Sequence, residues 1–166
     1  FTTPDAPTAI KTLVEKYKND DSVVIGAGTV LEPTTARLAI IAGAKFIVSP
    51  AFDKDVVEMC NLYRVVSCPG VMDPAGVVDA LKAGADIIKI FPGDIVGKNM
   101  IKDIHGPLPQ APLMPSGGVS VENAKEWMDA GCVAVSAGSS LTKGAKTGDY
   151  AAVTEMAKKF IAAIQA

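Results

Sequence analysis

A lysine inside an apolar run is the residue of this sequence best placed for covalent chemistry. Lys89 follows Ile87 and Ile88 and precedes Ile90 and Phe91, so we expect it in a buried strand. A free lysine side chain has a pKa of about 10.4, and burial among apolar neighbours favours its neutral amine. A neutral amine in a dry pocket attacks a ketone to form an iminium, which accepts electrons when a carbon–carbon bond breaks. The structural alternative is a strand lysine neutralised by a nearby carboxylate.

Two glycine-rich turns predict a second function, the binding of a phosphate group. Gly117 and Gly118 lie in the sequence Pro-Ser-Gly-Gly-Val, and Gly138 and Ser139 lie in Ala-Gly-Ser-Ser. Exposed backbone N–H groups and serine hydroxyls after the last two strands of a βα-barrel commonly form a phosphate cradle. The alternative is that these glycines only allow tight turns between strands and helices.

The strands that would position these residues follow a repeated plan. Three segments end an amphipathic stretch at Ala-Gly and continue with a short apolar run: Ala42–Pro50, Ala83–Pro92 and Ala130–Ser139. We expect each glycine to end a helix in the left-handed conformation, and each apolar run to form a strand buried on both faces. Three more short strands are expected, at Val23–Ala27, Val65–Cys68 and Leu113–Pro115.

Alignment of the three segments on their glycines gives Lys89 a place along its strand. Lys89 is level with Ser136, late in the strand, which predicts an ammonium at the carboxyl end of a parallel sheet, where the active sites of barrels lie. Thr29 and Pro50 end two earlier strands at the same face. Lys45 lies at the opposite end of its strand, so we expect only a structural role for it.

Helices are expected between the strands. Pro33 suits the first turn of a helix that reaches Ile41, and Asp73 and Pro74 open one that ends at Lys82. Ser120 is a candidate N-cap for a helix that carries Trp127. Apolar residues recur at helical spacing over 150–164. No linker or low-complexity run interrupts the pattern, so we expect one domain over residues 1–166.

Alternating strands and helices with continuously apolar strands predict an α/β fold with a parallel sheet, closed as a (β/α)8 TIM barrel or open and doubly wound. The open form would carry G-x-G-x-x-G after its first strand; Gly26 and Gly28 begin that pattern, but Leu31 occupies the third glycine position. We therefore expect the barrel. Six of its eight βα units are visible, so the first two strands are expected upstream of Phe1.

Composition excludes several classes of partner. The 166 residues are 49% hydrophobic and 20% charged, with a formal net charge of −2 and only two arginines, which gives no electrostatic case for nucleic acid. No apolar run reaches the ~18 residues of a membrane span. His105 is expected at the surface or at a helix end, and the three cysteines are expected to be small apolar fillers. No cluster has metal-ligand spacing, so we expect neither a metal nor another cofactor.

The motifs, taken in order, resemble one family. They are Gly-Ala-Gly-Thr-Val, Phe-Ile-Val-Ser-Pro, Pro-Gly-Val-Met, Lys-Ile-Phe-Pro, Gly-Pro and Pro-Ser-Gly-Gly-Val, and they cover Phe1 to the region of Ser139. Together they are similar to the 2-keto-3-deoxy-6-phosphogluconate (KDPG) and 4-hydroxy-2-oxoglutarate (KHG) aldolases. The resemblance implies a TIM barrel, a homotrimer and a cytoplasmic location.

The resemblance also implies roles for individual residues. Lys89 matches the Schiff-base lysine, and Phe91 matches the aromatic residue beside it. Thr29 and Pro50 match residues that line the pyruvate half of the site, and Ser116 stands where the family usually has threonine. The phosphate-binding turns of the family correspond to Gly117, Gly118, Gly138 and Ser139.

Three departures from the family pattern bear on the site. The general acid/base glutamate of the family would precede the segment that corresponds to Phe1. Thr2 occupies a position where some members have arginine, which leaves the source of substrate-carboxylate binding open. The usual Thr-Pro-Thr-Glu is replaced by Asp73-Pro74-Ala75-Gly76, which indicates a divergent subgroup.

The expected reaction is cleavage of a phosphorylated keto-deoxy sugar acid, or of 4-hydroxy-2-oxoglutarate, to pyruvate and an aldehyde such as glyceraldehyde 3-phosphate. The sequence does not distinguish these substrates or their C4 stereochemistry. Two alternatives remain: a phosphate-binding barrel isomerase or epimerase without a covalent adduct, and a non-catalytic, truncated barrel.

Overall fold

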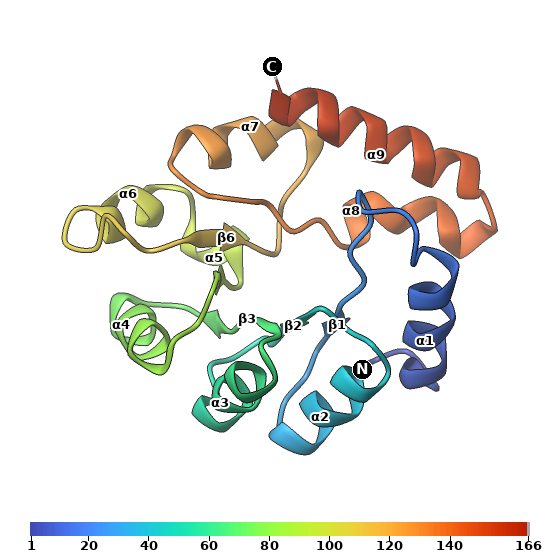
Figure 1. The fold of residues 1–166 in the computed structure, drawn as a ribbon. Coiled ribbons are helices and arrows are strands. Elements are labelled where there is room, and N and C mark those ends of the chain that lie inside the picture. The colour runs from blue at the N-terminus through green and yellow to red at the C-terminus, as the bar shows by residue number, and fades with distance from the viewer. Residues whose placement is uncertain (166) are drawn as a thin grey trace. The chain divides into compact units, whose positions relative to one another are not determined.

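The computed structural model describes residues 1–165, in which short strands alternate with helices (Figure 1). The elements in chain order are α1 (Ala6–Lys16), β1 (Ala27–Gly28), α2 (Pro33–Ile41), β2 (Phe46–Val48), α3 (Lys54–Tyr63), β3 (Val66–Cys68), β4 (Gly70–Val71), α4 (Pro74–Ala83), β5 (Ile88–Ile90), α5 (Gly93–Val96), α6 (Asn99–His105), β6 (Leu113–Pro115), α7 (Val121–Asp129), α8 (Ser139–Thr142), a 3-10 helix η1 (Lys143–Thr147) and α9 (Tyr150–Gln165). They form two compact units, Phe1–Lys89 and a second that begins at Ile90.

The first unit contains a parallel sheet of order β1-β2-β3. Its register pairs Ala27 with Ile47 and Ile47 with Ser67. Helices α2 and α3 lie side by side, and α3 packs on β3 (Figure 1). The buried core of this unit includes Ile10, Val30, Ala36, Ile47, Val56 and Cys60. The expected α/β fold with parallel strands is confirmed.

Strand β5 carries the boundary between the two units. In the first unit the Lys89 N–H donates to the carbonyl of Pro69 at 2.9 Å, and in the second the Ser116 N–H donates to the carbonyl of Ile90 at 2.9 Å. Ile88 and Ile90 have no exposed surface, whereas Lys89 between them is half-buried. This alternation follows from the period of two along a strand, which sends Lys89 to the opposite face from both isoleucines.

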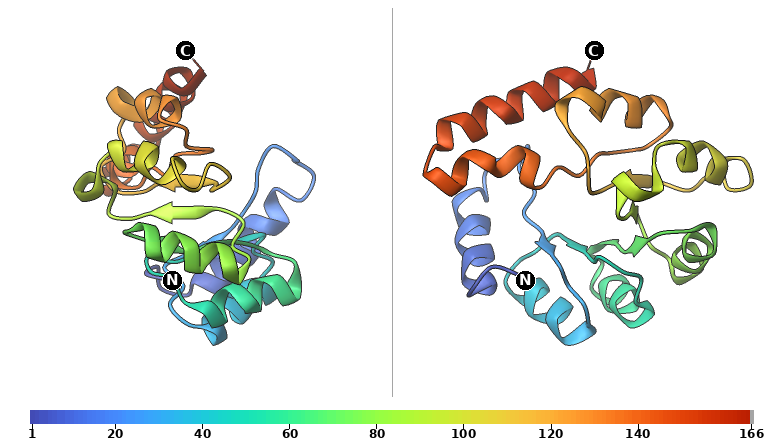
Figure 2. Two further views of the ribbon diagram at one scale, coloured as in Figure 1. Left: turned by 90° about the vertical axis from the view of Figure 1, so that its left-hand side faces the viewer. Right: turned by 180° about the vertical axis from the view of Figure 1, so that it is seen from behind.

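The second unit packs α7 against α9, which lie side by side in both orientations (Figures 1 and 2). Its buried side chains include Ile101, Ile104, Leu113, Trp127 and Phe160. Ser120 caps α7 through a capping box with Asn123, as the sequence predicts for this serine. Packing between helices, above all of α7 on α9, therefore accounts for much of the contact within this unit.

Two expected strands differ from those observed. The strand expected over Val23–Ala27 is confined to Ala27–Gly28, although the Lys45 N–H still donates to the Ile25 carbonyl at 2.8 Å. The segment Ala130–Ser139 contains no strand, only an isolated parallel bridge between Ser116 and Ser136. Exposure explains the shortening, because Val24 and Val133 are 60% and 53% exposed, so these apolar runs are not buried on both faces.

The predicted helix ends are confirmed. Asp73 is the N-cap of α4 and accepts the Gly76 N–H at 2.8 Å, and Pro33 is the first residue of α2. Gly43, Gly84 and Gly131 have φ values of 100°, 85° and 112°, the left-handed conformation expected after Ala-Gly helix ends.

The hydrogen-bonded strands of residues 1–165 form two three-stranded sheets, of order β1-β2-β3 and β4-β5-β6, and not one closed ladder. Closure into an eight-stranded barrel therefore stays a prediction. No helix among the described residues is long and apolar enough to cross a membrane.

The close approach of the backbone at Gly70 generates a stability prediction. A Cβ at this position would lie 2.3 Å from the Pro50 carbonyl oxygen and 2.8 Å from that of Ser49, and backbone atoms cannot move aside cheaply. Gly70→Ala should lower the free energy of unfolding by about 1–3 kcal/mol, measured by urea denaturation. Gly28→Ala is the matched control, because nothing lies within 4 Å of its added Cβ. Equal stability of the two variants would show that the contact at Gly70 relaxes freely.

Candidate active site

Lys89 lies in β5 as the sequence predicts, with its side chain half-buried. Burial lowers the pKa of its ammonium below the ordinary lysine value, because removing a charge from water disfavours the charged form. A smaller, opposing influence comes from Cys68, which raises the pKa of Lys89. Burial outweighs it, so the environment of Lys89 shifts the equilibrium toward the neutral amine that a nucleophile requires.

The protonation state of Cys68, in β3, bears on its influence on the pKa of Lys89. Cys68 is 4% exposed, and burial, followed by the charge of Asp86, raises the pKa of its thiol to about 11. The thiol is therefore protonated at neutral pH. The Asp86 carboxylate accepts hydrogen bonds from the N–H and hydroxyl of Ser67, at 2.8 and 3.2 Å. These two bonds give the Asp86 carboxylate a structural role, because they hold Ser67 of β3.

Thr29 and Pro50 follow the carboxyl ends of two neighbouring parallel strands, β1 and β2. They therefore lie at the same edge of the first sheet, as predicted. Thr29 has a φ of 57°, a left-handed conformation that is rare for a β-branched residue and that concentrates at functional sites. No feature of the sequence predicts this backbone conformation, because threonine normally avoids it.

The predicted phosphate-binding residues gather at one pocket in the second unit. Its volume is about 380 Å³, and it is lined by Phe91, Ser116, Gly117, Gly118, Val119, Ser120, Ser136, Gly138, Ser139 and Ser140. Six of these were predicted as site residues. The other four, Val119, Ser120, Ser136 and Ser140, were missed as lining residues, although Val119 follows Gly118 in the same motif, Ser136 is level with Lys89 in the aligned segments and Ser140 adjoins Ser139. Phe91, which also lines the pocket, follows Lys89 by two residues along the chain.

Hydrogen-bond donors without protein acceptors line this pocket. Gly117 and Gly118 have φ values of 94° and 69°, and within residues 1–165 no acceptor meets the N–H groups of Gly118 and Val119. The N–H groups of Ser139 and Ser140 likewise have no acceptor among the described residues. The lining contains no charged side chain. Such a concavity of backbone amides and hydroxyls suits an anion.

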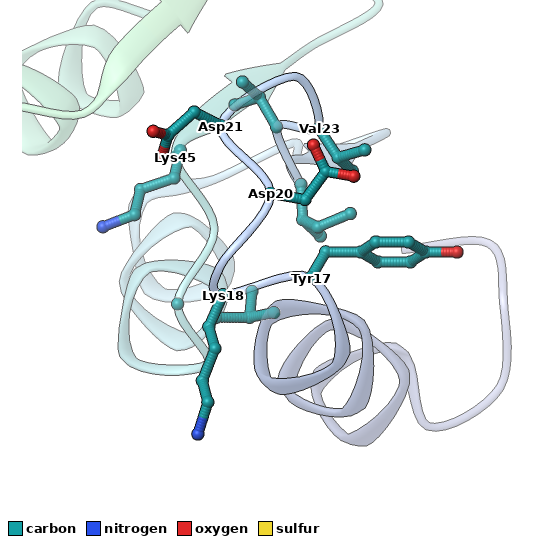
Figure 3. Close-up of a pocket in the computed structure, with 10 residues that line it drawn as sticks. Tyr17, Lys18, Asp20, Asp21, Val23 and Lys45 are labelled. Atoms are coloured by element: carbon teal, nitrogen blue, oxygen red, sulfur yellow. The ribbon is translucent and has the colours of Figure 1, made fainter.

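A second pocket lies at the other edge of the first sheet (Figure 3). Its volume is about 220 Å³, and it includes Lys45, which precedes β2, and Lys18, which follows α1. Figure 3 shows the ammonium groups of Lys18 and Lys45 pointing in different directions and away from the ring of Tyr17. The charged groups do not converge, and the carboxyl ends of the strands lie elsewhere. The pocket offers no arrangement for catalysis.

His105 and the cysteines have structural surroundings, as predicted. His105 is the last residue of α6, and its Nε2 lies 2.9 Å from the Ala111 carbonyl oxygen. Cys60, Cys68 and Cys132 are buried free thiols, and burial raises their pKa values to about 11, 11 and 12. A search of residues 1–165 finds no group of three or more His, Cys, Asp or Glu side chains arranged to hold a metal ion.

Comparison with protein families matches residues 1–156 to the family described as "KDPG and KHG aldolase". The 2-dehydro-3-deoxy-6-phosphogalactonate aldolase of Escherichia coli K12 is 34% identical over 145 residues, which are 87% of this chain and 70% of that protein. The 2-dehydro-3-deoxy-phosphogluconate aldolase of Haemophilus influenzae is 34% identical over 66% of this chain and 52% of its own length. The chain thus spans between half and three quarters of these relatives.

Solved structures give the same result. A native KDPGal structure superimposes with a TM-score of 0.92 at 31% identity, covering 99% of this chain and 78% of that one. The KDPG aldolase of Legionella pneumophila, with pyruvate captured as a covalent carbinolamine, has a TM-score of 0.82 at 27% identity and covers 96% and 76%. The relatives are named as aldolases, which are lyases. The chain belongs to the KDPG and KHG aldolase family.

Proposed function

We propose that this chain carries the Schiff-base chemistry of a class I aldolase, with Lys89 as the nucleophile. The observation that carries the proposal is the half-buried lysine of β5, whose pKa is lowered by burial. The substrate is a 2-keto-3-deoxy sugar acid with a terminal phosphate, or 4-hydroxy-2-oxoglutarate. The products are pyruvate and an aldehyde, glyceraldehyde 3-phosphate when the sugar acid has six carbons and carries its phosphate at C6.

The proposed reaction proceeds through an iminium. The neutral amine of Lys89 attacks the C2 ketone, and loss of water from the carbinolamine leaves the iminium. A base accepts the C4 hydroxyl proton while the C3–C4 bond breaks. The electron pair of that bond moves into the iminium and gives an enamine. Protonation at C3 and hydrolysis release pyruvate and restore the lysine. The pyruvate carbinolamine captured in the L. pneumophila relative supports the carbinolamine step.

The glycine-rich pocket of the second unit is proposed to hold the phosphate. Backbone N–H groups of Gly118, Val119 and Ser139 supply donors that have no acceptor within residues 1–165, and the Ser139 side chain is exposed. The 2-keto-3-deoxy-6-phosphogluconate aldolase of Zymomonas mobilis has been solved with 3-phosphoglycerate, which shows that a relative binds a phosphorylated three-carbon acid. Thr29, Pro50 and Ser116 are proposed to contact the keto-acid part of the substrate.

The finer architecture and the assembly are also proposals. Parallel pairing in β1-β2-β3 and the regular alternation with helices support a single TIM-barrel domain to which this chain contributes its βα units. Exposed apolar side chains on α2 and α3, including Ile41 and Leu62 at 66% and 71% exposure, support association of copies, and the family resemblance implies a homotrimer in the cytoplasm.

Borohydride trapping tests the nucleophile. Incubation with pyruvate and sodium borohydride should add one pyruvate-derived group to the protein, at Lys89, because reduction of the iminium makes the bond permanent. Lys89→Arg should abolish both labelling and cleavage, whereas Lys45→Arg should leave both intact. The readout is the mass of the intact protein and of the peptide that contains residue 89. Activity should survive EDTA.

Persistent labelling of Lys89→Arg would contradict the assignment of the nucleophile. Substrate turnover with no labelling of the wild-type protein would favour an isomerase or epimerase mechanism instead.

The phosphate pocket is tested at Ser139. Ser139→Asp puts a carboxylate at the pocket lining, so KM for a phosphorylated substrate should rise roughly 100-fold or more, since like charges in contact cost several kcal/mol. KM for 4-hydroxy-2-oxoglutarate, which lacks the phosphate, should change little. Ser139→Ala is the neutral control and should have a smaller effect. Equal losses on both substrates would show that the turns are only structural.

A further inference from the structure

The carbonyl groups of the glycine-rich turn are held by donors from outside it. The Ser116 carbonyl accepts the Gly93 N–H at 2.7 Å, and the Val119 carbonyl accepts the Ser140 hydroxyl at 2.7 Å. The Gly118 carbonyl accepts Nδ2 of Asn123 at 2.9 Å. Three of the four carbonyls between residues 116 and 119 are therefore fixed in direction.

Asn123 makes two contacts with this turn from the first turn of α7. Its Nδ2 donates to the Gly118 carbonyl, and its Oδ1 accepts the Ser120 N–H at 2.9 Å. Asn123 is not among the residues that line the pocket. A capping box usually has Glu or Gln at this position. The asparagine amide donates through its nitrogen and accepts through its oxygen, so one side chain contacts both backbone groups, which a carboxylate could not do.

These two contacts determine where the Val119 N–H points. In a planar trans peptide, the carbonyl of one residue and the N–H of the next point in opposite directions. The Gly118 carbonyl points to Asn123, so the Val119 N–H points away from it. The Ser120 N–H also points to Asn123, so the Val119 carbonyl points away, and it meets the hydroxyl of Ser140, which lines the pocket. The Val119 N–H therefore points away from Asn123, and Val119 itself lines the pocket.

We infer that Asn123 is a positioning residue for anion binding, because it holds the 118–119 peptide with the Val119 N–H directed into the pocket. The inference rests on the proposed phosphate pocket. Without the amide donor, the Gly118 carbonyl is free to rotate, since a φ of 69° at glycine leaves the peptide many alternatives. The Val119 N–H then loses its fixed direction, although no residue that touches the ligand has changed.

Two substitutions separate the donor from other effects. Asn123→Ala removes both contacts without adding charge, and Asn123→Asp keeps an acceptor for the Ser120 N–H but removes the donor to Gly118. Both should weaken binding of inorganic phosphate, measured by calorimetry on the full chain, about tenfold or more, the cost of one lost hydrogen bond to a charged group. KM for a phosphorylated substrate should rise by the same factor, while KM for 4-hydroxy-2-oxoglutarate and pyruvate trapping at Lys89 stay unchanged.

A matched control removes a helix cap elsewhere. Asp53→Ala deletes the Oδ1 acceptor of the Val56 N–H, 2.8 Å away at the start of α3, and should leave phosphate affinity unchanged. If Asn123→Ala does not fold, Asn123→Ser carries the test, because serine is also uncharged and its shorter side chain lacks the amide donor.

Three outcomes would overturn the inference. If only Asn123→Asp loses phosphate affinity, the effect is charge repulsion and not positioning. If both Asn123 variants lose affinity for the two substrates equally, Asn123 has only a structural role. If the wild-type chain does not bind inorganic phosphate at all, the proposed pocket and the role of Asn123 are both wrong.

Discussion

The removal of the Lys89 amine from water is the constraint on which the proposed chemistry depends. A strand that puts Ile88 and Ile90 fully into the core must turn the residue between them to the other face, and there Lys89 is half-buried. Each unit by which burial lowers its pKa represents about 1.4 kcal/mol of free energy against the charged state. The hydrogen bond from its N–H to Pro69 anchors the strand. The thiol of Cys68 stays protonated at neutral pH, so its influence on the pKa of Lys89 is smaller than that of burial.

The pocket of the second unit is proposed to bind a negative charge without a positively charged side chain in its lining. Its lining has no lysine or arginine, so an anion there is bound by backbone amides and hydroxyls. Amides bind without the conformational cost of ordering a long cationic side chain, but their direction depends on every peptide of the turn. Asn123 and Ser140 fix that direction from outside. Residues that never touch the ligand thus become part of its recognition.

Much of the local structure could be predicted from the sequence. Asp73 and Ser120 were identified as helix starts and Gly43, Gly84 and Gly131 as helix ends, because capping and left-handed glycine depend on a few neighbouring residues. The apolar run around Lys89 predicted β5, but the run was expected to be buried on both faces, whereas Lys89 is only half-buried between its two isoleucines. The glycine-rich motifs predicted most of the lining of the second-unit pocket.

The failures share a physical cause. Val23–Ala27 and Ala130–Ser139 have the apolar composition of strands, but strand formation depends on partners distant in sequence, which composition does not contain. The left-handed backbone of Thr29 contradicts the preference of its side chain and is imposed by its surroundings. The role proposed for Asn123 could not be predicted either. Its position in the first turn of a helix does not indicate that its amide also donates to the Gly118 carbonyl.

The pKa of the Lys89 amine is the quantity that tests this account most directly. In the full chain with 15N-labelled lysine, an NMR titration resolves the ε-amine of Lys89, and Lys89→Arg assigns its signal. Burial lowers this pKa, so the amine should lose its proton at lower pH than the exposed lysines, and the fraction of neutral nucleophile should rise over the same range. A Lys89 amine that titrates with the exposed lysines, or above them, would contradict the claim that its environment favours the neutral amine.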